Sequence, residues 1–220
     1  MAAAQGFRYL PGHLGPAAQA ALVAELRGLL AVAPLYRPVM PRSGWPFSVR
    51  MTNAGSHGWF ADRAGYRYLA RHPETGRPWP AIPPALQALW HELSGYPADP
   101  QCCLINFYAP QARMGLHRDE DEETFAAPVV SLSLGDSAVF RLGGSERRSP
   151  TRSLKLHSGD VMILGGAARL AYHGIDRVLG GSSRLLEGAD WAGGGKGGGK
   201  GGGRLNITLR RVTPAPDENA

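Results

Sequence analysis

Two histidines and one aspartate have the spacing of a metal site. His117 and Asp119 are separated by one residue, so both side chains point to the same side if the segment is extended. His173 follows much later in the chain, behind a predicted strand. Two histidines and one carboxylate form the facial triad of non-haem Fe(II) oxygenases, which leaves coordination positions open for a cosubstrate and O₂. The pattern therefore predicts an iron site.

Taken alone, the His-x-Asp motif is weak, because a chain with 7 histidines and 18 acidic residues can contain one by chance. The acidic run Asp119–Glu123 is equally typical of a solvated turn. The remaining histidines carry no second signal, and we expect them at the surface or as capping residues: His13, His57, His72, His91 and His157. The choice between metal site and solvated turn therefore depends on other segments.

The segment Arg204–Val212 predicts a strand whose polar residues Arg204, Asn206 and Arg210 share one face, with Thr208 between them. Arginines on an inward face are costly unless each meets an anion. A dicarboxylate needs one cation at each end, and a planar guanidinium matches a carboxylate. With the triad present, 2-oxoglutarate fits, because its keto-acid end can chelate iron while the other carboxylate reaches an arginine. The alternative is an edge strand with ordinary exposed arginines.

The elements that must position these residues are two helices followed by many short strands. Apolar spacing predicts helices over Ala17–Val32 and from about Pro84 to Leu93. Such an order favours an α+β, mainly β fold, a sandwich or jelly roll backed by helices. After Pro100 the β-type runs are Cys102–Tyr108, Val129–Leu134, Ala138–Leu142, Ser153–Leu156, Asp160–Leu164 and Arg204–Val212.

Composition describes a folded, basic chain. Its 220 residues are 43% hydrophobic, which suffices for one core, and its 24 Lys and Arg against 18 Asp and Glu give a net charge of +6. That charge favours an anionic partner such as nucleic acid. No apolar run is long enough to span a membrane, the start lacks the order of a secretory signal, and the adjacent Cys102 and Cys103 provide no disulfide framework. We therefore expect a cytoplasmic protein.

Several segments in order resemble the AlkB family of Fe(II)- and 2-oxoglutarate-dependent dealkylating dioxygenases, in particular the bacterial DNA-repair type. The resemblance extends from roughly Met51 to Arg211, and its specificity lies in the combination. The segments are Met51-Thr52-Asn53 with Gly58-Trp59, Gly65-Tyr66-Arg67-Tyr68, Pro78-Trp79-Pro80-Ala81, Cys103–Tyr108, His117–Glu122, Tyr172-His173-Gly174 and Arg204-Leu205-Asn206-Ile207-Thr208-Leu209-Arg210.

The resemblance implies roles for individual residues. The iron ligands would be His117, Asp119 and His173. Arg210 would lie near the iron-chelating end of 2-oxoglutarate and Arg204 at its distal carboxylate. The full set of implied 2-oxoglutarate-binding residues is Asn106, Tyr108, Arg204, Asn206 and Arg210.

The implied fold is a double-stranded β-helix (jelly roll) with a small nucleotide-recognition lid. One structural domain would comprise an N-terminal extension and helix (1–34), the lid (35–80), the dioxygenase core (81–213) and a disordered tail (214–220). The tract Gly193–Gly203, GGGKGGGKGGG, predicts a flexible inserted loop, without a counterpart in the family, that ends at Arg204. Before Gly165-Gly166, ahead of the third implied ligand, this chain has Leu164, where the AlkB-type sequence that it resembles has an aromatic residue.

The implied reaction is oxidative demethylation of 1-methyladenine and 3-methylcytosine in DNA, with O₂ and 2-oxoglutarate consumed and formaldehyde, succinate and CO₂ released. These methylated bases are cations, which an aromatic stack beside a carboxylate favours over neutral bases. A monomer is expected, with alkylated DNA, or RNA as an alternative, as partner and with neither membrane nor protein partner implied. The implied substrate-binding residues are Trp59, Tyr66, Tyr68, Asp121 and Arg147.

Other functions stay open at the level of the sequence. The same iron chemistry could act on RNA, protein or lipid alkyl groups. A jelly-roll module could hold a metal and bind nucleic acid without turnover, although such a binder has no need of two arginines for a dicarboxylate. A basic nucleic-acid-binding domain could also carry the His-x-Asp pair by accident.

Overall fold

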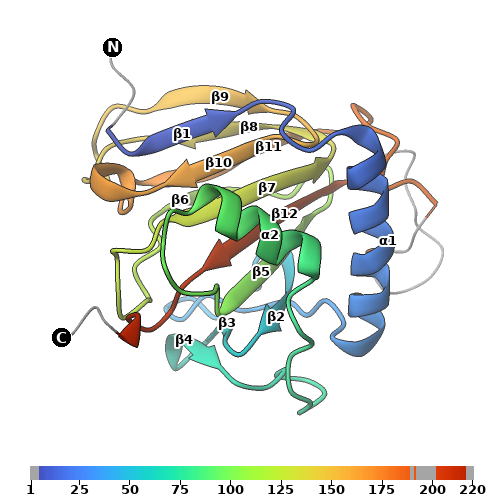
Figure 1. Ribbon diagram of the computed structural model, residues 1–220, viewed down its shortest axis with the longest axis horizontal. Helices are drawn as coiled ribbons and strands as arrows, with labels where there is room; N and C mark the ends of the chain where they lie inside the picture. Colours follow the sequence, from blue (N-terminus) through green and yellow to red (C-terminus); the bar gives the residue numbers. More distant parts are fainter. Residues whose placement is uncertain (1–4, 189–190, 192–201, 217–220) are drawn as a thin grey trace.

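The computed structural model describes residues 5–188, 191 and 202–216, which form two large antiparallel sheets, one two-stranded sheet and two α-helices (Figure 1). The larger sheet has six strands, in the spatial order β1 (Phe7–Leu10), β10 (Val161–Leu164), β7 (Val129–Gly135), β12 (Arg204–Arg210), β5 (Cys102–Tyr108) and β2 (Arg50–Gly55). The smaller sheet has the order β6 (Met114–His117), β11 (His173–Leu179), β8 (Ser137–Leu142) and β9 (Arg152–Leu156). The mainly β, jelly-roll fold predicted from the sequence is confirmed.

Both helices follow their apolar spacing. Helix α1 (Pro16–Val32) begins at a proline, which suits the first turn of a helix, and buries Leu22, Leu26 and Leu29. Helix α2 (Pro84–Leu93) buries Leu86, Leu89, Trp90 and Leu93. Figure 1 shows α2 lying across the larger sheet and α1 beside it. The sequence predicted both helices, with only the start of α1 displaced by one residue.

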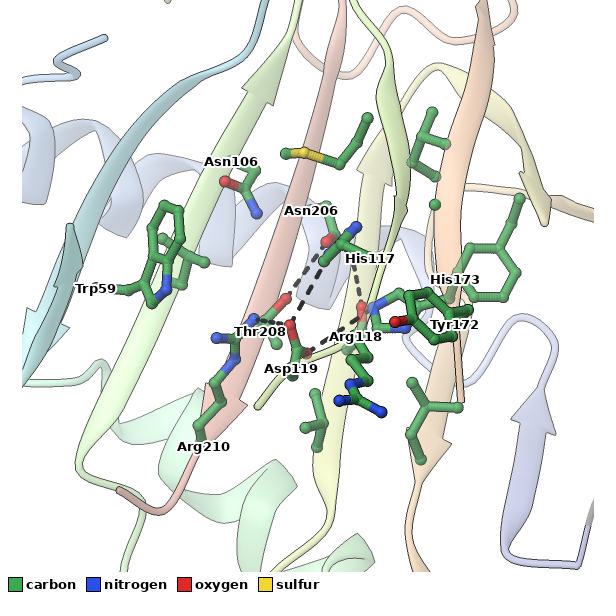
Figure 2. A pocket seen from close by; sticks show the side chains of 18 of the residues that line it. Trp59, Asn106, His117, Arg118, Asp119, Tyr172, His173, Asn206, Thr208 and Arg210 are labelled. Atoms are coloured by element: carbon green, nitrogen blue, oxygen red, sulfur yellow. Dashed lines mark hydrogen bonds and ion pairs between the residues drawn. The ribbon is translucent and has the colours of Figure 1, made fainter. Parts of the chain in front are cut away.

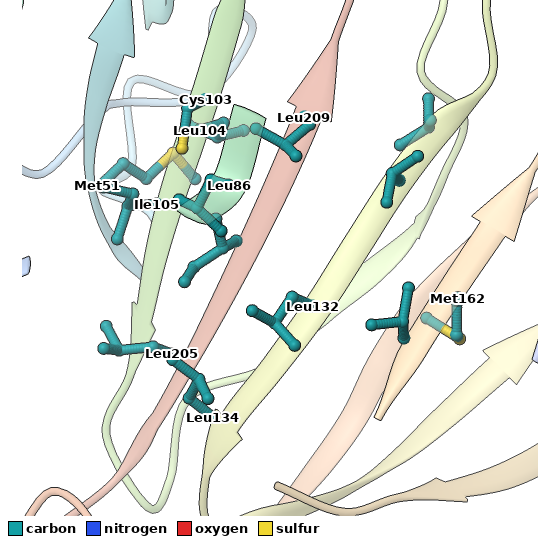
Figure 3. Packing of buried hydrophobic residues seen from close by; sticks show 14 of the residues in the cluster. Met51, Leu86, Cys103, Leu104, Ile105, Leu132, Leu134, Met162, Leu205 and Leu209 are labelled. Carbon is teal, nitrogen blue, oxygen red and sulfur yellow. The ribbon is translucent and has the colours of Figure 1, made fainter. Parts of the chain in front are cut away.

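Strand β12 has one apolar face and one polar face. Leu205, Ile207 and Leu209 are fully buried in the hydrophobic cluster that the helices cover. Leu205 is opposite Leu134 of β7, and Figure 3 shows these two side chains close together. Because side chains alternate along a strand, the polar residues of β12 project to the other side.

The register of β12 brings polar residues from three strands together. Asn206 pairs with Asn106 of β5 on one side and with Ser133 of β7 on the other, and Arg204 pairs with Tyr108. Residues that are far apart in sequence therefore become neighbours on one face of the larger sheet.

Several strands had no sequence signal strong enough to predict them. The strands β1 and β6 are only four residues long, and β2 is buried on both faces, so its sequence does not alternate. Strand β11 has register shifts in its pairing with both neighbours. The strands β3 (Gly58–Asp62) and β4 (Gly65–Leu69) pair only with each other. The strand predicted over Arg204–Val212 begins at Arg204 as expected, but it ends two residues early, at Arg210.

The ranges expected for the N-terminal extension, 1–34, and for the lid, 35–80, each supply a strand to the larger sheet. Strand β1 lies in the range 1–34 and β2 in the range 35–80, yet both belong to the six-stranded sheet. Most of the tract Gly193–Gly203 and the end of the tail, 217–220, lie outside the described residues. Within the described residues, no helix is long and apolar enough to cross a membrane.

Candidate metal and cosubstrate site

The three predicted metal ligands meet at the edge of the smaller sheet. His117 ends β6 and His173 begins β11, and the two are directly paired across these strands. Asp119 follows β6 and lies between them: its Oδ1 is 3.8 Å from Nε2 of His117 and its Oδ2 is 3.8 Å from Nε2 of His173. The ligand atoms of all three residues lie within 4.8 Å of one another (Figure 2).

Backbone carbonyls orient both imidazole rings. Nδ1 of His117 contacts the carbonyl of Gly115 at 2.9 Å, and Nδ1 of His173 contacts that of Ala171 at 2.9 Å. A carbonyl only accepts, so Nδ1 carries the proton in each ring and the lone pair is on Nε2. Both Nε2 atoms face Asp119. Each ring is therefore in the tautomer that a metal ligand requires, with its lone pair directed at the site.

Electrostatics favours the states that bind a cation. Burial, followed by the neighbouring His117, lowers the pKa of His173 to about 4, so this ring is neutral at pH 7. Burial by itself would raise the pKa of Asp119, but the guanidinium of Arg210 and the two histidines hold that pKa below its usual range. A neutral imidazole and an ionised carboxylate need lose no proton before they ligate a metal.

Arg210 joins the metal ligands to the cosubstrate residues. Its Nη2 donates to Oδ1 of Asp119 at 2.8 Å and its Nη1 to Oε1 of Glu122 at 3.2 Å. All three side chains are almost completely buried. Asp119 keeps its second oxygen, Oδ2, free of hydrogen bonds.

A cavity of about 280 Å³ extends from the triad between the two sheets. Four of the five residues expected to bind 2-oxoglutarate line it: Asn106, Tyr108, Asn206 and Arg210. The fifth, Arg204, is fully buried beside Tyr108 and does not line the cavity. It donates from Nη2 to Oγ of Ser133 at 2.6 Å and from Nη1 to the carbonyl of Asp136 at 3.3 Å. Burial lowers the pKa of Arg204 to about 10, so it is still a cation at pH 7.

Three unpaired polar atoms, on Asp119, Arg204 and Arg210, fit a metal ion and a dicarboxylate. Among the described residues, four buried side-chain atoms have no hydrogen-bond partner: Oδ1 of Asn106, Oδ2 of Asp119, Nε of Arg204 and Nε of Arg210. Leaving such atoms unpaired costs about 1–3 kcal/mol each. A cation would satisfy the aspartate oxygen, and carboxylate oxygens would satisfy the two guanidinium N–H groups. All four belong to residues that the sequence assigned to iron or 2-oxoglutarate.

Aromatic side chains line the mouth of the cavity. Trp59 of β3 stacks on Tyr66 of β4 with ring centroids 5.6 Å apart and 21° between the planes. The indole Nε1 of Trp59 donates to Oδ2 of Asp121 at 2.7 Å, and burial raises the pKa of that carboxyl. Phe47 meets the edge of Trp59 at 6.2 Å. A stacking surface and a carboxylate are thus adjacent at the entrance.

The remaining predicted substrate residues differ in position. Arg147 lines the cavity, donates to the carbonyl of Leu116 at 3.1 Å and lies over the Tyr172 ring at 5.9 Å. Tyr68 does not line the cavity; its hydroxyl donates to Oε1 of Glu122 at 2.5 Å, on the side of Arg210. The geometry therefore places Tyr68 beneath the site and Arg147 at its entrance.

Known proteins are similar to this chain in sequence and in fold. The family model described as the 2OG-Fe(II) oxygenase superfamily matches residues 6–210. A dioxygenase from Caulobacter vibrioides named an AlkB homolog is 51% identical over 212 residues, which are 96% of this chain and 89% of that protein. The chain belongs to the AlkB family of 2-oxoglutarate-dependent Fe(II) dioxygenases.

Further relatives agree. The alpha-ketoglutarate-dependent dioxygenase AlkB of Escherichia coli K12 is 42% identical over 164 residues, which are 73% of this chain and 76% of that protein. The solved structure of OsALKBH1 has a TM-score of 0.72 at 28% identity and covers 94% of this chain and 98% of its own. Fe(II), 2-oxoglutarate and O₂ are accordingly the cofactor and cosubstrates of this AlkB-family chain.

Two further residues of this AlkB-family site received no role from the sequence. Glu122 lies within the acidic run that resembles a solvated turn, yet its side chain is completely buried against Arg210 and Arg169. Arg169 belongs to no pattern, although it is also buried.

One of the other histidines is buried and caps a turn. His72 is 1% exposed, and its Nδ1 accepts from the backbone N–H groups of Glu74 and Thr75, which is the second of the two places expected for it, surface or cap.

Proposed function

We propose that this dioxygenase removes methyl groups from cationic N-methylated bases in DNA, such as 1-methyladenine and 3-methylcytosine. The proposal rests on the AlkB family membership and on a single observation, the adjacency of an aromatic stack and a carboxylate at the mouth of the metal-site cavity. Formaldehyde, succinate, CO₂ and the unmodified base are the expected products.

His117, Asp119 and His173 would hold the iron. Their free atoms face one another, and hydrogen bonds to Gly115 and Ala171 keep the two rings in the ligating tautomer. When bound, Fe(II) with O₂ and 2-oxoglutarate supplies the oxidation of the substrate's N-methyl group, and the resulting N-hydroxymethyl group breaks down to formaldehyde.

The larger sheet would hold 2-oxoglutarate. Arg210 is next to Asp119, so the guanidinium would meet the carboxylate at the iron-chelating end. Arg204, deeper in the sheet, has an unpaired Nε and would serve the distal carboxylate after a small rearrangement that opens it to the cavity. Asn106, Tyr108 and Asn206 would complete the cradle from the cavity wall.

The entrance would select the base by its charge. A cationic ring stacked on Trp59 and Tyr66 gains a cation–π interaction, and the carboxylate of Asp121 attracts the same charge. For a neutral base, both the interaction with the aromatic rings and the attraction to the carboxylate are weaker. A methyl group on a Watson–Crick nitrogen also weakens pairing, which lowers the cost of flipping the damaged base out of a helix. Arg147 at the rim would contact the strand.

The direct test is mass spectrometry of a single-stranded oligonucleotide with one 3-methylcytosine after incubation with the protein, Fe(II), 2-oxoglutarate and ascorbate. We expect loss of one methyl group and an equal yield of formaldehyde, and neither with His173→Ala. The same lesion in an RNA oligonucleotide is the second arm. CO₂ release from 2-oxoglutarate without demethylation of either oligonucleotide would contradict the proposed substrate while leaving the enzyme class intact, and demethylation of the RNA alone would replace DNA by RNA.

A further inference from the structure

Arg169 is a buried arginine that contacts the backbone of a proposed metal ligand. It follows the short 3₁₀ helix η1 (Gly166–Ala168) and precedes β11, which begins with His173. Only 2% of Arg169 is exposed. Its Nη1 donates to the backbone carbonyl of Asp119 at 2.7 Å, its Nε to the carbonyl of Ala127 at 3.0 Å and its Nη2 to Oε2 of Glu122 at 3.1 Å. The guanidinium therefore joins the segment after β6 to the turn before β11.

Asp119, Arg169, Glu122 and Arg210 form a closed ring. Arg169 holds the carbonyl of Asp119, and Arg210 holds its carboxylate at 2.8 Å. Glu122 links the two arginines, with Oε2 bonded to Arg169 and Oε1 to Arg210. Two cations and two anions balance, which offsets part of the cost of burying four charges. The ring fixes Asp119 at both ends while Oδ2 stays free.

We propose that Arg169 is a positioning residue that holds Asp119 in the geometry for metal binding. The proposal rests on the proposed role of the triad as the iron site. Without Arg169 the carbonyl of Asp119 loses its donor, and Glu122 becomes a buried carboxylate whose only arginine is Arg210. Arg210 then lies between two carboxylates with no second cation to share them. Asp119 is thereby freed to rotate, and its Oδ2 no longer faces the two histidines at a fixed position.

The test is Mn(II) binding by calorimetry to the full chain carrying Arg169→Met or Arg169→Lys. Residues that orient a metal ligand typically change affinity about 10–100-fold when they are mutated. We expect the Mn(II) dissociation constant of Arg169→Met to rise by that factor. Arg169→Lys should recover part of the loss, because an ammonium group restores the charge beside Glu122 but not all three hydrogen bonds. The Fe(II) concentration for half-maximal activity should shift by the same factor.

Arg211 offers a matched control. This arginine also donates three hydrogen bonds, in its case all to backbone carbonyls, those of Asp99, Thr213 and Pro214, and none of them belongs to a proposed ligand. Arg211→Met should lower the melting temperature without changing Mn(II) affinity. Equal losses of affinity in Arg211→Met and Arg169→Met would identify general destabilisation and overturn the proposal.

His173→Ala separates this proposal from the assignment of the site. If wild-type protein binds Mn(II) and His173→Ala does not, the site holds, and an unchanged affinity in folded Arg169→Met then overturns the role of Arg169 alone. Unchanged binding in His173→Ala would instead refute the triad. If Arg169→Met fails to fold by circular dichroism, Arg169→Lys decides. Unfolding of both variants would show that Arg169 serves the fold and would also overturn the proposal.

Discussion

Oδ1 of Asp119 lies 2.8 Å from Nη2 of Arg210, so a proposed metal ligand and a proposed 2-oxoglutarate residue form one buried ion pair. Arg204 has no such link, because its hydrogen bonds go to Ser133 and to the carbonyl of Asp136. The two arginines of β12 share one face of one strand, yet only Arg210 is coupled to the metal ligands. Substitutions at the two positions should therefore fail in different ways.

Arg204→Met should raise the KM for 2-oxoglutarate about ten- to a hundredfold, because a lost hydrogen bond to a charged group costs about 1.5–3 kcal/mol. Its Mn(II) affinity should stay at the wild-type value. Arg210→Met should raise the same KM and also weaken Mn(II) binding, since Asp119 loses its cation. Cosubstrate titrations and calorimetry measure both effects. A normal 2-oxoglutarate titration in either variant would remove that arginine from the cosubstrate site.

His117→Ala, Asp119→Ala and His173→Ala should each abolish 2-oxoglutarate turnover and leave the far-ultraviolet circular dichroism of the metal-free protein unchanged. The hydrophobic core includes none of the three side chains, so their removal takes away no apolar packing. A variant that kept near-normal activity and metal binding would remove that residue from the ligand set.

Sequence reasoning succeeded where local spacing determined geometry. The interval between His117 and Asp119, the alternation along Arg204–Arg210 and the apolar face of Pro84–Leu93 each reflect a repeat of the backbone, and the structure follows all three. It failed where a partner is remote. Glu122 is buried only because Arg169 and Arg210 come from distant segments, and no pattern near Glu122 encodes that contact.

Asp121→Asn should reduce activity on cationic bases more than on neutral ones. The substitution removes the negative charge at the cavity mouth but retains a polar side chain beside the indole of Trp59. We expect kcat/KM for an oligonucleotide with 3-methylcytosine to fall at least tenfold, and that for neutral 3-methylthymine to change much less. Trp59→Phe, which keeps an aromatic ring and loses the hydrogen bond, is the matched control. Equal losses on both lesions in Asp121→Asn would rule out selection by charge.

Replacing residues 193–201 with a shorter Gly/Ser loop should leave 2-oxoglutarate turnover intact, because both flanks are anchored near Leu186. The indole of Trp191 donates to the carbonyl of Leu186, and a side chain on Gly202 would meet Leu186 at 2.6 Å. The carbonyl of Gly203 accepts from the backbone N–H of Asp136 at 2.8 Å, which fixes the start of β12.

The tract contributes only two charges, Lys196 and Lys200. The replacement should therefore weaken DNA binding slightly, and the slope of log affinity against log salt concentration should fall by the contribution of about two phosphate contacts at most. The contrasting variant is Gly203→Ala. Gly203 has a φ of +78°, and a Cβ there would lie 2.8 Å from the carbonyl oxygen of Tyr108. We expect Gly203→Ala to raise the KM for 2-oxoglutarate by displacing Arg204, whereas the shortened loop does not. If the shortened loop instead destroyed cosubstrate binding with the fold preserved, the tract itself, and not Gly203, would set the position of Arg204.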